Sequence, residues 1–422
     1  MSSALLTVWR SVMAKLKTIS LDPLYALPST GSSRDEVLYL PAWHRVDSDC
    51  QGALGSNGRF WWERHGYALA ILLHKSSYSY SAQVTILEFF ARFLAPWLGP
   101  VDERGVERWK SFMTDDHNPL ELSWDWSTAR KPPTIRLSLE PIGEHAGTAQ
   151  DLCNMHASND FVKALLGDYP GHNMEWFHHF NNFFNEGVEI PTDMGHASKI
   201  FWAFNLDAND LAGKVYFTPR YRAMASGKTN FQIISEAIEA APTSSREKLS
   251  ALYMFQEYVG QQKKSPLEVE ALAIDLVDPS QSRLKIYFRS RQTSFQSVRD
   301  IMTLDGRLIN EKTAKHAEKG LSNLRRLWDS IFDQQGVPDE SPLPSSNHET
   351  AGILYYVDFH LGGQMPKVKI YLPVRHYAKN DWQVMQAVSS YMSSTLEGLH
   401  GTTYLEENDA PLAFCEAMSD IL

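Results

Sequence analysis

The sequence is poor in cysteine, in clustered positive charge and in long apolar runs. Its 422 residues include three cysteines, Cys50, Cys153 and Cys415, a small and odd number that argues against a disulfide framework and favours a reducing compartment. The net charge is −10, and no run of lysine or arginine has the density of a nucleic-acid-binding tail. No apolar stretch reaches the roughly 18 residues of a membrane-spanning helix. We therefore expect a cytoplasmic protein that has no membrane span and does not bind nucleic acid.

Hydrophobic residues make up 43% of the chain and aromatic residues 12%, which is enough to bury a large core. Alternation of polar and apolar residues predicts four strand pairs, at 119–126 and 134–140, 199–206 and 213–218, 271–277 and 283–289, and 353–359 and 367–373. Helical periodicity lies around them at 58–98, 149–187, 229–262, 295–333 and 380–398. Half-polar strands flanked by helices suit an α+β fold in which helices surround an antiparallel barrel with a wet lumen. We expect this to be one domain over 41–422, after an N-terminal extension at 1–40.

Three of the predicted second strands carry a cation, an aliphatic residue and a tyrosine in a row. These motifs are Lys214-Val215-Tyr216, Lys285-Ile286-Tyr287 and Lys369-Ile370-Tyr371. Because strand side chains alternate between faces, the lysine and the tyrosine of each motif point the same way. Arg283 extends the second motif, and Arg136 is a cation on the polar face of the first pair. Such a face fits a site that holds a polyanion and also shelters a cationic or apolar group.

Several further motifs follow one another in a set order between residues 58 and 390. They are Phe60-Trp61-Trp62, Leu98-Gly99-Pro100, Met113-Thr114-Asp115-Asp116, Leu120 to Trp124, Leu139 to Gly143, Ala146-Gly147-Thr148, Arg283 to Tyr287, Ile301 to Leu304, and Pro366 to Tyr377. Their joint order resembles that of the fungal aromatic prenyltransferases of the dimethylallyltryptophan-synthase type. That family is built from repeated αββα units around an antiparallel barrel, the ABBA fold.

The resemblance implies a role for each polar residue of the strands. The positions that grip the prenyl diphosphate match Arg136, Lys214, Arg283 and Lys285. The tyrosines that shield the allylic cation match Tyr216, Tyr287 and Tyr371. Ionisation of an allylic diphosphate leaves an anion for the basic groups and a carbocation that aromatic faces stabilise. Lys369 stands where many relatives have a neutral glutamine, so it either adds a diphosphate contact or only extends the charge of its strand.

The acceptor site implied by the resemblance centres on Glu121. This position matches the glutamate that accepts the indole N–H hydrogen bond and orients the ring; the alternative is a surface carboxylate. Phe112 and Met113 lie just upstream, where they would touch the acceptor. Lys199 either accepts the ring proton or is a solvent lysine.

Metal ligation is weakly indicated by the sequence. Asp115-Asp116 lacks the third acid of the Mg²⁺-binding pairs of isoprenyl-chain synthases, and we interpret it as a solvated turn. His178 and His179 are adjacent, which is not the i, i+4 spacing of a helical metal site. The resemblance implies dimethylallyl diphosphate as co-substrate, no requirement for Mg²⁺ or Ca²⁺, and a monomer or homodimer.

One departure from the family pattern concerns the C-terminus. Relatives continue to a further hairpin that closes the barrel, whereas 401–422 contains no pair of alternating stretches. The leading hypothesis is transfer of a dimethylallyl group to an aromatic carbon of an indole-containing acceptor: tryptophan, a cyclic dipeptide, or an indole alkaloid or diterpene. The alternatives are an impaired homologue that only binds prenyl diphosphate or an aromatic ligand, and an enzyme with a phenolic acceptor.

Overall fold

The computed structural model describes residues 39–126, 132–188, 200–207, 211–396 and 409–421. Nearly all of the predicted N-terminal extension, residues 1–38, lies outside this part of the chain, and so does Lys199. No helix within the described ranges is both long and apolar enough to cross a membrane.

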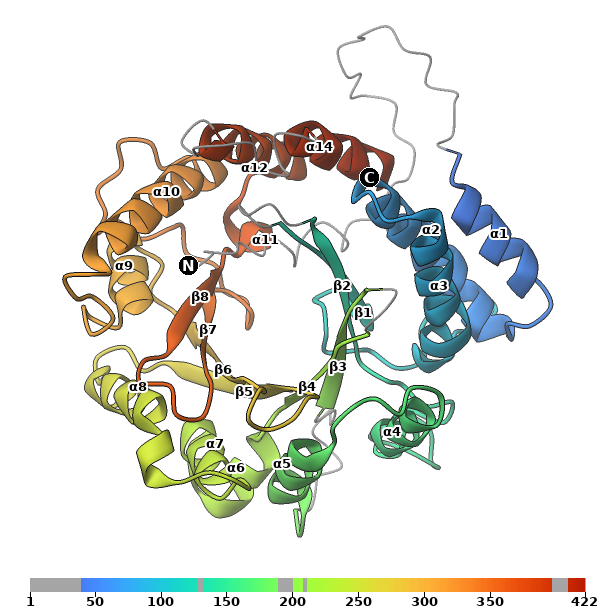
Figure 1. Cartoon of the computed structure of the whole chain (residues 1–422), viewed down its shortest axis with the longest axis horizontal. Coiled ribbons are helices and arrows are strands. Elements are labelled where there is room, and N and C mark those ends of the chain that lie inside the picture. Colours follow the sequence, from blue (N-terminus) through green and yellow to red (C-terminus); the bar gives the residue numbers. More distant parts are fainter. Residues whose placement is uncertain (1–38, 127–131, 189–199, 208–210, 397–408, 422) are drawn as a thin grey trace, which may run out of the picture.

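Eight strands form one antiparallel sheet in which each strand pairs with the next along the chain. The strands are β1 Leu120–Asp125, β2 Thr134–Leu139, β3 Ile200–Asn205, β4 Gly213–Phe217, β5 Glu268–Asp275, β6 Leu284–Ser290, β7 Ile353–Phe359 and β8 Lys367–Tyr371. All eight fall at the predicted positions, to within a few residues at their ends. The sheet curls around the centre of the molecule (Figure 1), so its inner face is turned toward that centre and its outer face meets the helices. We call the region that the inner face surrounds the lumen.

Period-2 alternation separates the two faces of the sheet. On β1, Leu120, Leu122 and Trp124 are buried in the main core, while the residues between them are partly exposed. In β5 a bulge between Val269 and Ala271 interrupts this alternation. Val269 therefore packs in the main core, whereas Ala271 belongs to the small cluster on the inner face.

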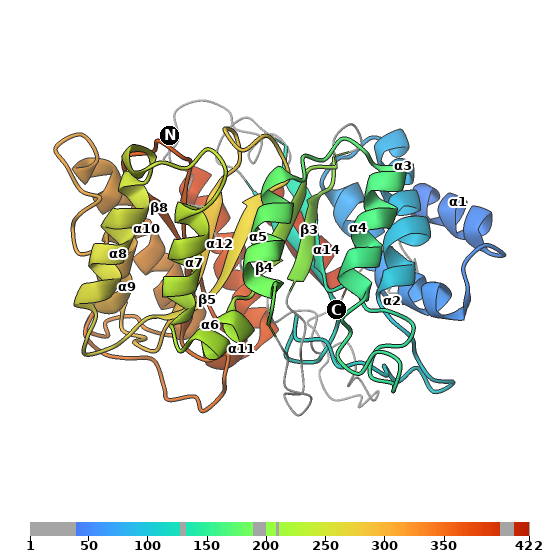
Figure 2. The same cartoon turned by 90° about the horizontal axis from the view of Figure 1, so that it is seen from below.

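Helices surround the sheet and stand alongside its strands (Figures 1 and 2). They are α1 Pro41–Cys50, α2 Ser56–Lys75, α3 Tyr80–Glu88, η2 Phe89–Leu94, η3 Ala95–Trp97, α4 Ala157–Asp168, α5 Glu175–Asn185, α6 Arg220–Ser226, α7 Asn230–Glu239, η4 Arg246–Lys248, α8 Ser250–Gln261, α9 Phe295–Thr303, α10 Ala314–Phe332, α11 Val374–Tyr377, α12 Asp381–Leu396 and α14 Ala410–Ile421. The predicted helical ranges did not include α1, α6, α11 or α14. Fully buried tryptophans join the helices to the outer face, such as Trp202 of β3, which contacts Phe161 and Phe177.

The sheet has two edges, because no described residue pairs β8 with β1. The helices nevertheless continue across this opening: α12 packs against α10 and α14, and α14 packs against α2 (Figure 1). The predicted α+β architecture is confirmed as a curled sheet enclosed by helices. Within the described residues after β8 there are helices and no further hairpin, and 397–408 lie outside them.

Candidate active site

The three cation-x-Tyr motifs lie on β4, β6 and β8 with their polar members on the inner face. The aliphatic residues between them, Val215, Ile286 and Ile370, are buried in the main core. The tyrosines form a separate cluster on the other face, together with Ala271, Ala273, Leu354 and Tyr356. The alternation predicted from the sequence thus describes the lumen wall.

Asp275 is at the centre of the positive charges. Arg283 donates from Nε to its Oδ2 at 2.8 Å, and Lys285 donates from Nζ to its Oδ1 at 2.6 Å. Burial alone would raise the pKa of Asp275, but Lys285 and Arg283 outweigh it and hold that pKa far below its usual value. Asp275 therefore remains ionised and keeps both cations aligned along one wall.

Lys214 is paired in register with Asp275 on the neighbouring strand, and its Nζ donates to Asn205 Oδ1 at 2.6 Å. Burial is the main reason that its pKa lies well below the ordinary value, and the nearby charges of Lys285 and Arg136 add to the effect. Arg136, on β2, forms an ion pair with Asp125. These neutral or acidic partners hold the cations along one wall of the lumen.

The pKa values of Lys285 and Lys369 show that positive charge is concentrated in the lumen. Burial lowers the pKa of Lys285 to about 8, and it lowers that of Lys369 to about 8 as well, with Arg136 contributing. The Nζ of Lys369 lies 5.8 Å from the ring centroid of Tyr356 and 5.9 Å from that of Tyr371. Lys369 therefore lies within the lumen, beside the tyrosines.

The tyrosines form a continuous aromatic wall. Ring centroids are 5.5 Å apart for Tyr216 and Tyr287, 5.0 Å for Tyr287 and Tyr356, and 6.0 Å for Tyr356 and Tyr371. The Tyr371 hydroxyl donates to that of Tyr287 at 3.4 Å. Burial raises the pKa of all four phenols, so they stay neutral at ordinary pH and present electron-rich faces to the lumen.

Glu121 lies on β1 on the same face as these groups. Although burial is the main reason that the pKa values of Tyr216 and Tyr371 are raised, the Glu121 carboxylate contributes to both increases. Phe112 continues the wall, since its ring centroid is 5.6 Å from that of Phe201, which stacks on Tyr216 at 4.1 Å. All five predicted diphosphate positions, together with Glu121 and Phe112 of the predicted acceptor positions, are therefore brought to one lumen.

The segment that carries Phe112 and Met113 is fixed from behind by a buried carboxylate. Glu140 accepts hydrogen bonds from Trp109 Nε1 at 3.0 Å, Ser111 Oγ at 2.5 Å and the Phe112 backbone N–H at 3.3 Å. Met113 is buried. The position of Phe112 therefore depends on the hydrogen bonds that Glu140 accepts from this segment.

Sequence reasoning missed several lumen residues: Asn205, Asp275, Tyr356 and Phe201. All four lie on the first strand of a hairpin, whereas the cation-x-Tyr motifs lie on second strands. Alternation along β7 would have found Tyr356, because it shares a face with Leu354 and Asp358.

Comparison with known proteins agrees with this geometry. Residues 57–407 match the family model described as tryptophan dimethylallyltransferase. The chain belongs to this family. Members of the tryptophan dimethylallyltransferase family transfer a dimethylallyl group to an aromatic acceptor, and the chain is accordingly an aromatic dimethylallyltransferase. Dimethylallyl diphosphate is the co-substrate that membership implies, and the family is generally independent of metal ions.

Among the curated relatives, the 4-O-dimethylallyl-L-tyrosine synthase of Claviceps purpurea is 36% identical over 361 residues, covering 82% of this chain and 79% of its own. The 7-dimethylallyltryptophan synthase of Aspergillus fumigatus is 31% identical, covering 80% and 75%. Among solved structures, AnaPT from Neosartorya fischeri has a TM-score of 0.72 at 22% identity, covering 89% and 88%. NotF in complex with brevianamide F and DMSPP has a TM-score of 0.74 at 22% identity, covering 91% and 90%. The two structures establish the shared fold.

Proposed function

We propose that the chain prenylates an aromatic amino acid, with the dimethylallyl diphosphate bound by Arg136, Lys214, Arg283, Lys285 and Lys369. The single observation that supports this best is the inner face itself, where these cations adjoin a wall of neutral tyrosines. The diphosphate would replace Asn205 as the partner of Lys214, and it would accept further hydrogen bonds from Arg283 and Lys285 while Asp275 holds these two cations in place. Its charge would then be matched by the protein's own cations, without an obligatory Mg²⁺ or Ca²⁺.

The chemical step would begin with cleavage of the bond between the allylic carbon and the diphosphate oxygen. The bonding electron pair leaves with the diphosphate, and the allylic cation faces Tyr216, Tyr287, Tyr356 and Tyr371. Their rings stabilise the cation and keep water from capturing it. A nucleophilic atom of the acceptor then forms the new bond, and the acceptor loses a proton.

Glu121 would orient the acceptor by accepting a hydrogen bond from its N–H or O–H group. With a phenol, the same carboxylate would receive the proton that leaves the oxygen as the new ether forms. Phe112 and Met113 would pack against the acceptor ring. Because the structure describes nothing at 199, the role of Lys199 as a proton acceptor stays a prediction.

The hydroxyl of tyrosine is the first acceptor to test, because the relative with 36% identity is named for that product. The indole ring of tryptophan is the second, supported by the relatives with 31% identity. These relatives are named for dimethylallylated amino acids, which favours this class over cyclic dipeptides and indole diterpenes.

The experiment is to incubate the purified chain with dimethylallyl diphosphate and with L-tyrosine, L-tryptophan or a cyclic dipeptide, each with and without a chelator. Product mass and the site of attachment would identify the acceptor. Absence of any product, with dimethylallyl diphosphate still bound, would favour the binding-only alternative.

The role of Glu121 has its own test, in which Glu121→Ala is compared with Glu318→Gln on the exposed face of α10. We expect Glu121→Ala to abolish transfer while leaving dimethylallyl diphosphate affinity within about twofold, since the carboxylate does not contact the diphosphate. Glu318→Gln should behave as the wild type. Unchanged turnover of Glu121→Ala would refute the proposed acceptor site.

A further inference from the structure

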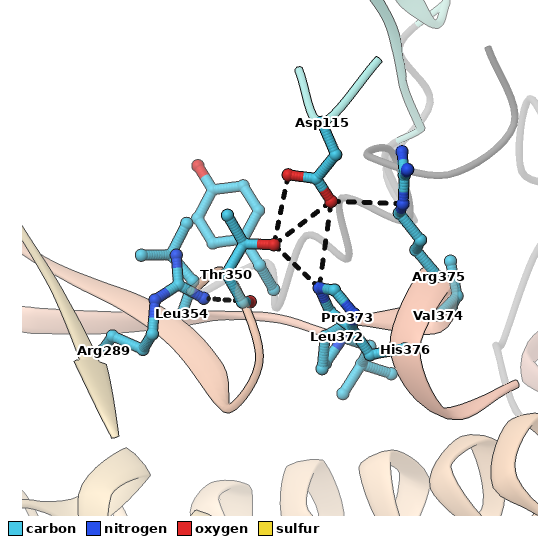
Figure 3. A pocket seen from close by; sticks show the side chains of 10 residues that line it. Asp115, Arg289, Thr350, Leu354, Leu372, Pro373, Val374, Arg375 and His376 are labelled. Carbon is cyan, nitrogen blue, oxygen red and sulfur yellow. Dashed lines mark hydrogen bonds and ion pairs between the residues drawn. The ribbon is translucent and has the colours of Figure 1, made fainter. Parts of the chain in front are cut away.

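A polar cluster lies at the end of the inner face, next to Leu354 and Tyr371 (Figure 3). We call it the edge cluster; its residues are Asp115, His348, Thr350, Arg375 and His376. Arg375 Nε lies 3.1 Å from Asp115 Oδ2. The turn predicted at Asp115-Asp116 is present, but the side chain of Asp115 is only 14% exposed, so the prediction that it is solvated was wrong.

The edge cluster joins segments that are far apart in the sequence and belong to opposite edges of the sheet. Asp115 lies shortly before β1, and the other members lie just before β7 or in α11, which follows β8. The contacts within the edge cluster therefore link the chain next to β1 to the chain next to β8. These are the two edge strands, and no described hydrogen bonds pair them with each other. Anything that tightens the edge cluster would hold the open side of the sheet together.

Electron-rich atoms converge on one hydroxyl in this cluster. Thr350 Oγ1 is 2.8 Å from His376 Nε2 and 3.0 Å from His348 Nδ1. It is also 3.2 and 3.1 Å from the two carboxylate oxygens of Asp115. The Thr350 hydroxyl therefore lies between all three side chains, and the Thr350 backbone N–H also donates to His348 Nδ1 at 3.2 Å.

We propose that Asp115, His348 and His376 form a binding site for one divalent transition-metal ion, such as Zn²⁺ or Co²⁺, that fastens the two edges of the sheet. Each residue offers one ligand atom, and the three atoms lie within 4.8 Å of one another. Two imidazoles and a carboxylate suit Zn²⁺ or Co²⁺ and disfavour Mg²⁺ and Ca²⁺, which take oxygen ligands.

The surroundings are compatible with such an ion. Ligand distances of about 2.0–2.2 Å around a tetrahedral zinc place ligand atoms about 3.4 Å apart. The three atoms, which now lie within 4.8 Å of one another, would move inward, and the Thr350 hydroxyl between them would turn away. The cavity beside the edge cluster has a volume of about 40 Å³, which suits an ion or a water molecule and excludes an aromatic ring. Arg375 approaches Asp115 Oδ2, so Oδ1 is the carboxylate atom for the metal.

The role of this ion differs from that of a catalytic metal. The edge cluster lies beside Leu354 and Tyr371, which pair at one end of β7 and β8, while Asp358 and Lys367 pair at the other. The ion would therefore lie at the tyrosine end of the lumen, and the diphosphate would still be held by protein cations.

Titration of the chelator-treated full chain with Co²⁺, followed by visible absorption, tests the site, with Zn²⁺ as competitor. We expect one Co²⁺ per chain and a higher thermal midpoint when it is bound. His348→Ala removes an exposed ligand and should weaken binding at least tenfold and abolish the thermal shift. His316→Ala, on the exposed face of α10, is the matched control and should bind as the wild type does.

Absence of binding to the wild type, or equal binding by the two variants, would overturn the proposal and assign any Co²⁺ to scattered surface histidines. A fully folded His348→Ala protein with tenfold weaker binding would support it. Because the readout is metal binding, the result is independent of whether the chain prenylates tyrosine, tryptophan or neither.

Discussion

Binding of dimethylallyl diphosphate should weaken as the pH rises above 8, because two of the proposed diphosphate ligands lose their charge there. Burial lowers the pKa of Lys285 and of Lys369 to about 8. The bound diphosphate would favour the protonated form of each lysine, so deprotonation in the empty site competes with binding. A lysine with that pKa is about 90% protonated at pH 7 and about 10% protonated at pH 9. Each lysine whose charge is required should therefore raise the dissociation constant about tenfold between these values, and both together about a hundredfold.

The assay is calorimetric titration with a non-hydrolysable thiolo analogue of dimethylallyl diphosphate at pH 7, 8 and 9. Phosphate groups with a second pKa near 6 keep a nearly constant charge over this range. Replacing both lysines, as Lys285→Arg with Lys369→Arg, provides the control, because a guanidinium stays charged to above pH 12. We expect the double variant to have a nearly flat profile. A flat profile for the wild type, or the same slope for both proteins, would refute the assignment of these lysines.

The free energy of unfolding of the protein without ligand should rise over the same pH range in which binding of the diphosphate weakens. In the unfolded chain both lysines have pKa values near 10.4, so between pH 8 and about 10 the unfolded state binds more protons than the folded state. The free energy of unfolding contributed by these two groups should therefore rise with pH. Urea unfolding at pH 7.5 and 9 would measure this change, and we expect the larger contribution to the free energy of unfolding at pH 9.

Three further substitutions follow from the packing of the lumen and the core. Asp275→Asn leaves Arg283 and Lys285 without their buried carboxylate and should lower the free energy of unfolding, measured with urea, by about 3–5 kcal/mol. Added inorganic diphosphate should restore part of this loss. An unchanged urea midpoint would contradict the pairing. Tyr287→Leu removes a ring facing the allylic cation, worth about 2 kcal/mol or roughly thirtyfold in turnover, whereas Tyr287→Phe should stay within a few fold; equal rates would exclude a cation-stabilising role. Trp202→Ala should cost about 3–5 kcal/mol in unfolding free energy, measured by urea titration, and a loss below about 1 kcal/mol would show that the core collapses around the gap.

The strands and their inner faces were predictable because both depend on local alternation. Lys285 and Tyr287 must share a face wherever the strand lies, and Ile286 between them indicates which face meets the core. This is why the predicted cations and tyrosines of β4, β6 and β8 line one lumen in the structure.

Partners across strands could not be predicted in the same way. That Asp275 is the partner of Lys285 follows from the register between β5 and β6, which depends on hydrogen bonds between distant segments. The same applies to Asp115, whose contacts come from Thr350, just before β7, and from α11 near the far end of the chain. The helix α14 was missed because the C-terminus was searched for alternating strands, while its buried residues, such as Phe414 and Met418, recur at helical spacing.

The bulge in β5 divides the lumen into two parts whose sequences can change independently. From Ala271 to Asp275 the alternation keeps Asp275 beside the cations, and before Ala271 the phase is reset. An inserted or deleted residue near Glu268 could be absorbed at the bulge without turning Asp275 into the hydrophobic core. Natural variation and laboratory evolution could therefore remodel this end of the lumen, through changes in strand length as well as in side chains, while the arrangement of charges around Asp275 is inherited unchanged.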